Sequence, residues 1–583
     1  MSQSIDFSRV GAIVLRAMRR PFMILLLVYS VAVVGMTLIP GKEINGETHY
    51  MSIFHAFYFM TYTATTTGFG EIPYEFSNAQ RLWAIFCLYI SVIAWFYAVG
   101  AIINLLQNPY YQSALAERNF SRKVLNITQP FYILCGFGDT GSLLARGLSD
   151  AMIPAVVIEL DSARIKALSL RDYRVTMPGL CADASVPKHL LEAGLQRTNC
   201  KGVIIVTSDE EVNLRVSVIA HILSPKINII TMSKADIYEE RLAALGREVH
   251  IVDPFKTFSK GLAIAMFYPE LYTLNRWLIG APGATLDDSG NPPTGAWIIC
   301  GYGRLGHELY NVLAGSNIST VVIDMKEPPE EEKVDNYIIG RATEKNLMEA
   351  GIKNAAGIMI VTDDDGRNLG ILINARSLNP DLYIIVRQNR HENEVAFSAG
   401  QADIIIQPSL VTARRIVYSL IAPLLKTLFR YLMETTREFH NPVQDLIDRL
   451  KIVLGHSRPH LVTIRIDEEE SIAVVAALDR GEKVFLKDLM RDPGAWDNHL
   501  ATIPLVVQLE GGGVNVLPDG DYVIRKNDTI LLCGQERAHN LLKSNMQNEY
   551  ALHYVRTGVD EPRGWVMQWF ARKYSGTDKS CND

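Results

Sequence analysis

Residues 132–141 read YILCGFGDTG, and residues 297–306 read WIICGYGRLG. Three further pairs of segments match downstream, at offsets that fall from 165 to 155 residues. These pairs are VVIE at 156–159 with VVID at 321–324, LEAG at 191–194 with MEAG at 348–351, and VIIVTSD at 203–209 with IMIVTDD at 358–364. The chain therefore contains two copies of one structural unit, and the second copy is shorter in a connecting loop.

Each copy has the pattern of a parallel sheet with helices on both faces, because apolar β-branched segments alternate with helical ones. The glycines follow a strand and open a helix, and an acid follows the first glycine by 23 residues, Glu159 after Gly136 and Asp324 after Gly301. The glycines let a helix N-terminus approach a pyrophosphate, and the acid can bind ribose hydroxyls. Together these features form a dinucleotide-binding fingerprint.

The second copy is favoured as the nucleotide site because Arg304 and Arg341 supply cations for phosphate, where the first copy has Asp139 and Asp183. In either copy the alternative is that the glycine turn is kept only for packing. The candidate residues of the second copy are Gly301, Gly303, Arg304, Leu305, Gly306, Asp324, Arg341 and Thr362. Those of the first, weaker copy are Gly136, Gly138, Gly141, Glu159, Asp183 and Thr207.

Composition narrows the possible classes of protein. At 583 residues the chain is too long for one domain, and 48% hydrophobic with 21% charged residues is typical of a folded protein. The net charge of −6 gives no basic field for nucleic acid, so no nucleic-acid partner is expected. The 7 cysteines include no CxxC and predict neither a disulfide framework nor a zinc site. A mean hydropathy of +0.09 indicates a small membrane part with a large soluble part.

The N-terminal region contains two uncharged apolar segments, 22–39 and 82–106. At about 1.5 Å per residue the first spans roughly 27 Å, close to the thickness of a bilayer core, and the second is longer. A signal peptide is the alternative for the first segment, but no small-residue cleavage site follows it and a second span does. Both are predicted to be transmembrane helices.

Basic residues set the expected orientation. They flank the two spans, whereas the linker between the spans, 40–81, carries mainly acids. The basic residues are Arg9, Arg16, Arg19 and Arg20 before the first span and Arg118, Arg122 and Lys123 after the second. By the positive-inside rule both termini are cytoplasmic, which predicts a multi-pass protein of the cell (inner) membrane.

The linker between the spans has an unusual composition. Residues 53–63, IFHAFYFMTYT, are too short to cross a membrane and long enough to re-enter it, and they run into TTTGFGE at 65–71. Irregular backbone at membrane depth is tolerated only where protein or a watery cavity surrounds it. Glycine permits positive φ, so consecutive carbonyls can be aimed the same way and can replace the water shell of a cation. A polar turn between two helices of a small anchor is the alternative.

This linker resembles the selectivity filter of potassium channels, commonly TMTTVGYGD. Three residues depart from that pattern, Thr67 for valine, Phe69 for tyrosine and Glu71 for aspartate, and they put the hydrogen bonding behind the filter in question. The resemblance implies a homotetramer in which main-chain carbonyls and the Thr66 hydroxyl coordinate K⁺. The filter residues it implies are Thr66, Thr67, Gly68, Phe69 and Gly70.

A two-span pore followed by two Rossmann-like units resembles prokaryotic, multi-ligand-gated potassium channels with tandem RCK (regulator of potassium conductance) domains. The resemblance implies eight RCK units from four subunits in a cytoplasmic ring, which expands on binding small molecules and pulls the inner helices. NAD or an ADP-type nucleotide is the expected ligand, with Ca²⁺ as a further one. Candidate Ca²⁺ ligands are Asp363, Asp364 and Asp365, although solvated acid runs are commoner. Gly100 is the candidate gate, or merely a packing contact.

The predicted fold class is a membrane α-helical two-span pore domain plus cytosolic α/β, with two Rossmann-like RCK units and a small C-terminal α+β subdomain. The expected divisions are a pore domain at 1–110 (spans 22–39 and 82–106, pore helix 52–64, filter 66–70), a linker at 111–129, a first RCK domain at 130–290, a second RCK N-lobe with crossover helices at 294–455, a C-terminal subdomain at 456–545 and a tail at 546–583.

The expected function is a tetrameric K⁺-selective channel gated by cytosolic ligands, within the lipid bilayer, with no catalytic residues. One alternative is a membrane-anchored NAD-dependent oxidoreductase, although no separate substrate domain with a placed acid and base is evident. Another is the regulatory subunit of a potassium transporter, although such subunits normally lack a pore of their own.

Overall fold

The structure is a computed structural model, in which the chain forms two compact units, residues 1–128 with 178–180 and the remainder. The described residues are 3–44, 47–72, 74–233, 236–246, 249–281, 284–287, 292–328, 334–435, 442–455 and 457–560.

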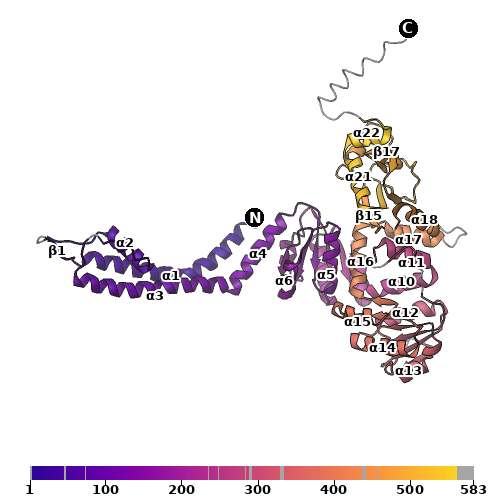
Figure 1. The fold of residues 1–583 in the computed structure, drawn as a ribbon, viewed down its shortest axis with the longest axis horizontal. Helices are drawn as coiled ribbons and strands as arrows, with labels where there is room; N and C mark the ends of the chain where they lie inside the picture. Colours follow the sequence, from indigo (N-terminus) through magenta and orange to yellow (C-terminus); the bar gives the residue numbers. More distant parts are fainter. Residues whose placement is uncertain are drawn as a thin grey trace, which may run out of the picture. The chain divides into compact units, whose positions relative to one another are not determined.

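Unit 1 is built on two long helices that pack against each other, with a short helix that contacts both (Figure 1). Its elements are α1 (Gln3–Leu38), β1 (Glu43–Ile44), β2 (Glu47–Thr48), α2 (Ile53–Ala64), α3 (Asn78–Gln107) and α4 (Pro109–Leu125). Val14–Leu38 and Asn78–Gln107 are long and apolar enough to cross a membrane, so the two predicted spans are confirmed as apolar helices. The first helix extends beyond the uncharged segment and includes Pro21 in its interior.

Local sequence sets where two of these helices begin. Ser52 caps α2 by accepting a hydrogen bond from the backbone N–H of His55, and Ser77 with Gln80 forms a capping box at the start of α3. Such caps satisfy backbone N–H groups that have no partner within the helix. The residues between the two helices, which include the filter-like sequence, are therefore held between two fixed helix ends.

The first copy is a six-stranded sheet in the order β5-β4-β3-β6-β7-β8, and the pairs from β4 to β8 are parallel. Its strands are β3 (Phe131–Cys135), β4 (Ala155–Glu159), β5 (Gly179–Cys181), β6 (Cys200–Ile205), β7 (Asn228–Met232) and β8 (Val249–Val252). Its helices are α5 (Asp139–Asp150), α6 (Ser162–Leu170), α7 (Pro187–Glu192), α8 (Glu210–Leu223) and α9 (Asp236–Ala243).

The second copy repeats this topology strand for strand, in the order β11-β10-β9-β12-β13-β14, all parallel. Its strands are β9 (Trp297–Cys300), β10 (Thr320–Asp324), β11 (Tyr337–Ile339), β12 (Gly357–Ile360), β13 (Tyr383–Arg387) and β14 (Ile404–Ile406). Its helices are α12 (Arg304–Ala314), α13 (Glu344–Glu349), α14 (Asp365–Leu378) and α15 (Glu394–Ala399). Both orders are those of a dinucleotide-binding Rossmann fold, so the prediction of two such units is confirmed.

The helices that follow each copy pack on the other copy. α16, which follows the second copy, lies along α5 of the first, and its Ile416 shares a buried core with Leu144 and Leu148 (Figure 1). α10, which follows the first copy, lies against α12 and buries Phe255 and Leu262 in the core of the second. The helices concerned are α10 (Pro254–Phe267), α11 (Pro269–Leu278), α16 (Pro408–Ile421), α17 (Leu425–Thr435) and α18 (Pro442–Leu454).

The C-terminal subdomain combines an antiparallel sheet, in the order β15-β20-β18-β19, with short helices, as the predicted α+β class requires. Its strands are β15 (His460–Arg465), β18 (Thr502–Gln508), β19 (Val514–Val516) and β20 (Thr529–Gly534), with the separate hairpin β16 (Arg491–Asp492) and β17 (Ala495–His499). Its helices are α19 (Ile472–Asp479), α20 (Leu486–Leu489), α21 (Glu536–Gln547) and α22 (Glu549–Thr557).

The subdomain continues into the segment that the sequence analysis assigned to a tail at 546–583. Leu552 and Val555 of α22 are buried in its core, because the two apolar residues lie on one face of the helix. Residues 561–583 of that tail lie outside the described residues.

Candidate functional site

Backbone hydrogen bonds attach the filter-like loop to the last turn of α2. The N–H groups of Thr67 and Gly68 both donate to the carbonyl oxygen of Tyr62, at 2.9 and 3.3 Å, and the N–H of Thr66 donates to Thr63 at 3.1 Å. Residues 65–70 are exposed in the single chain. The loop is therefore fixed on its helix side and left uncovered by its own chain on the other.

The sign of φ alternates along this loop. Thr66, Gly68 and Gly70 have positive φ of 59°, 64° and 75°, whereas Thr67 and Phe69 between them do not. Such alternation turns successive peptide planes, so that their carbonyl oxygens can face the same side of the strand. An added Cβ at Gly68 or Gly70 would meet no heavy atom within 4 Å, so the backbone conformation, and not lack of space, favours glycine there. This geometry suits main-chain coordination of a dehydrated cation.

The three residues that depart from the common filter sequence all make contacts behind the loop. The Glu71 carboxylate accepts a hydrogen bond from the Tyr58 hydroxyl at 3.0 Å, and its carbonyl oxygen accepts one from the Tyr62 hydroxyl at 2.8 Å. The Thr67 hydroxyl lies 2.9 Å from that of the threonine two residues earlier, and the Phe69 ring packs edge-on against Tyr62. These contacts tie the filter-like loop to the short helix α2.

The small residues of α3 divide into two groups. Ser91, Ala94 and Ala98 are buried within the single chain, whereas Gly100 is exposed. An added Cβ at Gly100 would meet nothing within 4 Å, so contacts within the chain do not require glycine at this position. A gate at Gly100 stays a prediction.

The glycine turns of the two copies have the same local geometry. Gly136 and Gly301 have positive φ of 99° and 105°. A Cβ at Gly141 would lie 2.1 Å from the carbonyl oxygen of Gly136, and one at Gly306 would lie 2.0 Å from that of Gly301. Both turns therefore exclude side chains where the first turn of α5 or α12 approaches the preceding strand.

The acid at the end of the second strand supports the turn in both copies. The Glu159 carboxylate accepts a hydrogen bond from the N–H of Phe137, and the Asp324 carboxylate accepts one from the N–H of Tyr302 at 2.7 Å. The other oxygen of each acid accepts from the N–H two residues later, at 2.9 Å in both copies. Each carboxylate oxygen keeps further acceptor capacity, and its role toward a ribose stays a prediction.

The cation that the sequence favours for phosphate is engaged in an ion pair. Arg304 Nη2 lies 2.6 Å from Asp253 Oδ2, and its guanidinium lies over the Phe255 ring, 5.8 Å from the ring centre. Asp253 is almost fully buried, because it also caps α10. Arg341 is exposed, whereas Leu305 is buried in the core. A phosphate at Arg304 would have to compete with Asp253, and the preference for the second copy stays a prediction.

The threonine after the third strand of each copy makes the same contact with a buried asparagine. The hydroxyls of Thr207 and Thr362 donate to Asn213 and Asn368 at 2.6 and 2.5 Å. Each asparagine amide in turn donates to the last carbonyl of the fourth strand, that of Met232 at 3.1 Å and that of Arg387 at 2.8 Å. Met232 and Arg387 therefore occupy equivalent positions in the two copies.

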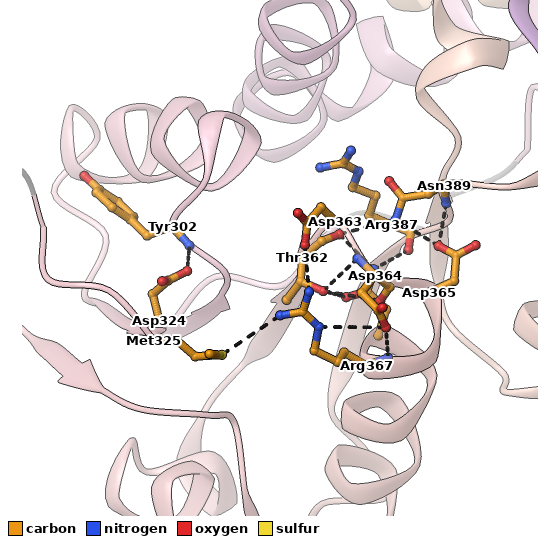
Figure 2. Close-up of polar contacts among 11 residues, drawn as sticks. Tyr302, Asp324, Met325, Thr362, Asp363, Asp364, Asp365, Arg367, Arg387 and Asn389 are labelled. Atoms are coloured by element: carbon orange, nitrogen blue, oxygen red, sulfur yellow. Dashed lines mark hydrogen bonds and ion pairs between the residues drawn. The ribbon is translucent and has the colours of Figure 1, made fainter. Parts of the chain in front are cut away.

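The predicted Ca²⁺ ligands are each engaged with protein groups (Figure 2). Asp363 lies 2.9 Å from Arg367, Asp364 caps α14, and Asp365 accepts from the backbone and side chain of Asn389 at 2.7 and 2.9 Å. Burial raises the pKa of Asp365, but the hydrogen bonds that it accepts outweigh burial and lower the pKa below its ordinary value. The described residues contain no group of three or more His, Cys, Asp or Glu placed to hold a metal, and Ca²⁺ binding stays a prediction.

A cavity of about 530 Å³ opens over the glycine turn of the first copy. It brings together five of the six residues predicted for that copy, which are Gly136, Gly138, Glu159, Asp183 and Thr207. Its wall also includes two cations that the sequence analysis did not name, Arg164 from α6 and Arg387 from the end of β13. Alignment of the copies at an offset of 155 places Arg387 at a strand end opposite Met232, and this signal could have identified it.

Comparisons with protein families agree with this division of the chain. A family described as "TrkA-N domain" matches residues 132–253 and again 297–408, and a family described as "Ion channel" matches residues 18–108.

Curated relatives match parts of the chain. Potassium channel protein 1 of Methanocaldococcus jannaschii is 32% identical over 133 residues, 22% of this chain and 40% of that protein. An uncharacterized protein of Methanothermus fervidus is 30% identical over 204 residues, 34% of this chain and 31% of that protein. A TrkA homolog of the Trk potassium uptake system of Pyrococcus horikoshii is 22% identical, with 43% of this chain and 97% of that protein covered. The chain thus spans less than half the length of the first curated relatives that it matches.

Among solved structures, the GsuK channel is similar over 92% of this chain and 99% of its own, at 16% identity and a TM-score of 0.47. The GsuK channel bound to NAD has the same coverage, at 14% identity and a TM-score of 0.46. An ion-channel domain with two apolar helices is followed here by two TrkA-N domains, and by this composition the chain belongs with the two-transmembrane potassium channels that carry RCK domains.

Proposed function

We propose that the protein is a K⁺-selective channel whose filter is residues 66–70. The observation that carries this proposal is the alternation of φ at Thr66, Gly68 and Gly70, in a loop held by α2 between two apolar helices. Potassium is the permeant ion because aligned main-chain oxygens can replace its water shell.

A homotetramer is the assembly that this filter requires. One loop has oxygens on one side only and cannot surround an ion, whereas four loops around an axis can. The exposed residues 65–70 are available for that arrangement. Four chains would bring eight RCK units into one gating ring, with both termini and the ring in the cytoplasm, as the basic residues that flank the spans favour.

Cytosolic nucleotides of the NAD or ADP type are the proposed gating ligands. Both copies have the glycine turn and the acid of a dinucleotide site, and the turn leaves room for a pyrophosphate at the helix N-terminus. The relatives named as potassium channels and as TrkA homologs support a regulatory role for such domains here. The residues proposed to respond include Arg304, Asp324 and Arg341 in the second copy.

Ca²⁺ is proposed as a secondary ligand at Asp363, Asp364 and Asp365. Its binding would have to replace the ion pair of Asp363 with Arg367 and the amide contacts of Asp365. Hard cations take oxygen ligands of this kind, and a Ca²⁺-dependent shift in melting temperature that Asp363→Asn abolishes would support the site.

An enzyme is the less favoured reading. A membrane-anchored NAD-dependent oxidoreductase would need a substrate domain with a placed acid and base, and turnover of NADH with any substrate would revive it. A regulatory subunit of a potassium transporter would not need the filter-like loop.

Ion flux through protein reconstituted in liposomes tests the proposal. The wild type should pass K⁺ and exclude Na⁺. Gly68→Ala should abolish this selectivity, because a left-handed conformation costs alanine about 1–2 kcal/mol and favours a different loop. Gly11→Ala is the matched control, since an added Cβ there meets nothing within 4 Å and its φ is not positive. Equal passage of Na⁺ and K⁺ by the wild type would contradict the proposal.

A further inference from the structure

The cavity over the first copy has walls from both copies. One wall consists of the first glycine turn and Glu159, and the other consists of Arg387 and Asn389 with the start of α16. The second wall is brought there by packing, because α16 follows the second copy in sequence but lies along α5 of the first. A ligand in this cavity would therefore contact both copies at once.

Two polar groups on the second-copy wall are buried without a hydrogen-bond partner among the described residues. They are Nε of Arg387 and the hydroxyl of Ser409. The Arg387 guanidinium lies over the Phe255 ring, 5.1 Å from the ring centre, and its side chain extends away from Arg367 and Asp365 in Figure 2. A buried donor without an acceptor is unfavourable, so these groups favour a ligand that supplies oxygen acceptors.

Arg387 keeps its charge in this position. Burial lowers the pKa of its guanidinium, and the nearby carboxylates of Asp363 and Asp365 oppose that shift. An arginine side chain stays protonated in proteins even after a shift of this kind. The wall therefore presents a positive charge, which favours an anionic ligand.

The N-termini of two helices begin at the same cavity. Gly138 caps α5, and Pro408 is the first residue of α16. Helix N-termini carry partial positive charge and unpaired N–H groups that suit phosphate. Arg164 adds a second guanidinium, since its Nη1 would lie 3.3 Å from a Cβ at Gly138.

The acids on the first-copy wall are already partnered by backbone N–H groups. Glu159 accepts two such bonds, Asp209 caps α8, and Asp183 accepts from the N–H of Ser185 at 2.8 Å. The hydrogen bond from Ser185 is the main reason that the pKa of Asp183 is lowered. These acids suit ligand hydroxyls on their own side of the cavity, while the cations stand on the other.

We propose that this cavity binds a nucleotide with a pyrophosphate, whose phosphates contact Arg387, Ser409 and the start of α16 and whose ribose lies toward Glu159. The inference rests on the proposed function, because the ligand is the gating nucleotide, but it places a site in the first copy and completes it with residues of the second. The volume of about 530 Å³ lies within the roughly 300–1,000 Å³ of small-molecule sites.

The second-copy wall is also bonded to that copy's own predicted site. The Asn389 side chain, which lines the cavity, donates to the Asp365 carboxylate at 2.9 Å and to the Thr362 carbonyl at 3.4 Å. A ligand that holds this wall against the first copy therefore stabilises one arrangement of the two copies over others. This gives the nucleotide a physical route to change the shape of the cytosolic part.

Calorimetric titration of ADP into the purified full-length protein tests the inference, with NAD, adenosine and inorganic pyrophosphate as further probes. Arg387→Gln should weaken ADP binding about tenfold or more, since a hydrogen bond to a charged group is lost. Ser409→Ala should weaken it several-fold without disturbing a bonded group, and Arg387→Lys should recover part of the loss. Arg215→Gln, an exposed arginine on α8, is the matched control and should bind as the wild type.

The probes separate the possible outcomes. Adenosine, which lacks phosphate, should bind equally to the wild type and to Arg387→Gln. An equal loss for adenosine and ADP, or unchanged ADP affinity in both Arg387→Gln and Ser409→Ala, would overturn the inference. Absence of ADP and NAD binding to the wild type at millimolar concentration would also overturn it. Because binding is measured without ion flux, a failure of K⁺ selectivity would leave this result standing.

Discussion

The two glycine turns have the same local geometry but different surroundings. In the second copy Arg304, the first residue of α12, is paired with Asp253 before α10. In the first copy Asp139 takes the place of Arg304, and Gln407 before α16 takes the place of Asp253. A cavity lies over the first turn, and a largely buried ion pair lies beside the second.

This difference shows that the fingerprint specifies the turn and not its availability to a ligand. The glycines and the acid form the same strand–turn–helix in both copies, with nearly equal φ at Gly136 and Gly301. The charges around each turn come from the helix that the other copy contributes. A cation next to the glycines is therefore weaker support for a phosphate site than a cation brought from the opposite copy.

The largest expected effect tests whether the two turns are equally strict. Gly141→Ala and Gly306→Ala each place a Cβ about 2 Å from a backbone oxygen that cannot move without breaking the turn. Each change should destabilise its own copy by about 4 kcal/mol or more. Hydrogen exchange of β3 and β9, measured by mass spectrometry, should rise only in the altered copy. Gly370→Ala, where an added Cβ meets nothing within 4 Å, is the control. Normal protection in either variant would contradict the geometry of that turn.

A pH experiment sharpens the comparison at the regions that follow the copies, since the C-terminal subdomain follows only the second. His539 is buried there, with its ring nitrogens near His460 and Thr502 at 2.8 and 3.1 Å. Burial, and then the charge of His460, lowers the pKa of His539 to about 4. The folded state therefore holds His539 neutral, whereas the unfolded chain takes up a proton below about pH 6.5.

Stability of the subdomain should be full above pH 6.5 and should fall as the pH drops toward 4, by about 3 kcal/mol at most. Hydrogen exchange of β20, corrected for the intrinsic effect of pH, measures this loss. His539→Gln removes the titrating group and should flatten the dependence. A wild-type profile that is already flat between pH 7 and 4 would contradict the assignment.

The ion pair of the second copy gives a smaller effect. Arg304→Gln and Asp253→Asn should each destabilise the second copy by about 2 kcal/mol, since each leaves a largely buried group without its partner. The double variant should cost much less than the sum, because the two residues act as one unit. Additive losses in thermal melts would show that the pair contributes nothing.

The same Arg304→Gln variant, and Asp324→Asn, should change the nucleotide response if the second copy binds ligand. In single-channel recordings the unitary conductance should stay at the wild-type value, because neither residue belongs to the filter-like loop. An altered conductance would mean that the nucleotide site has been assigned to the wrong residues.

The sequence predicted well where the signal is local. The strands beside the glycines, the helices that start at Pro254, Pro269 and Pro408, and the helix before the filter-like loop each have their cause within a few residues. Proline at the first position of a helix needs no N–H partner, so these starts are visible in the sequence.

The walls of the cavity could not be predicted in this way. Arg387 and Ser409 lie about 250 residues from Gly136, and only the exchange of α10 and α16 between the copies brings them to the first turn. Arg304 followed a local rule for phosphate sites, but its partner Asp253 lies 51 residues away in the sequence. Packing between the copies, and not the fingerprint, determines which cation faces a ligand.

Single-channel recording in a planar bilayer, with ADP titrated on the side of the cytosolic copies, tests most directly whether nucleotides control a K⁺ pore. Our account predicts a K⁺-selective current whose open probability changes with ADP while its unitary conductance stays constant. A current that does not distinguish K⁺ from Na⁺, or an open probability that ignores both ADP and NAD, would contradict it.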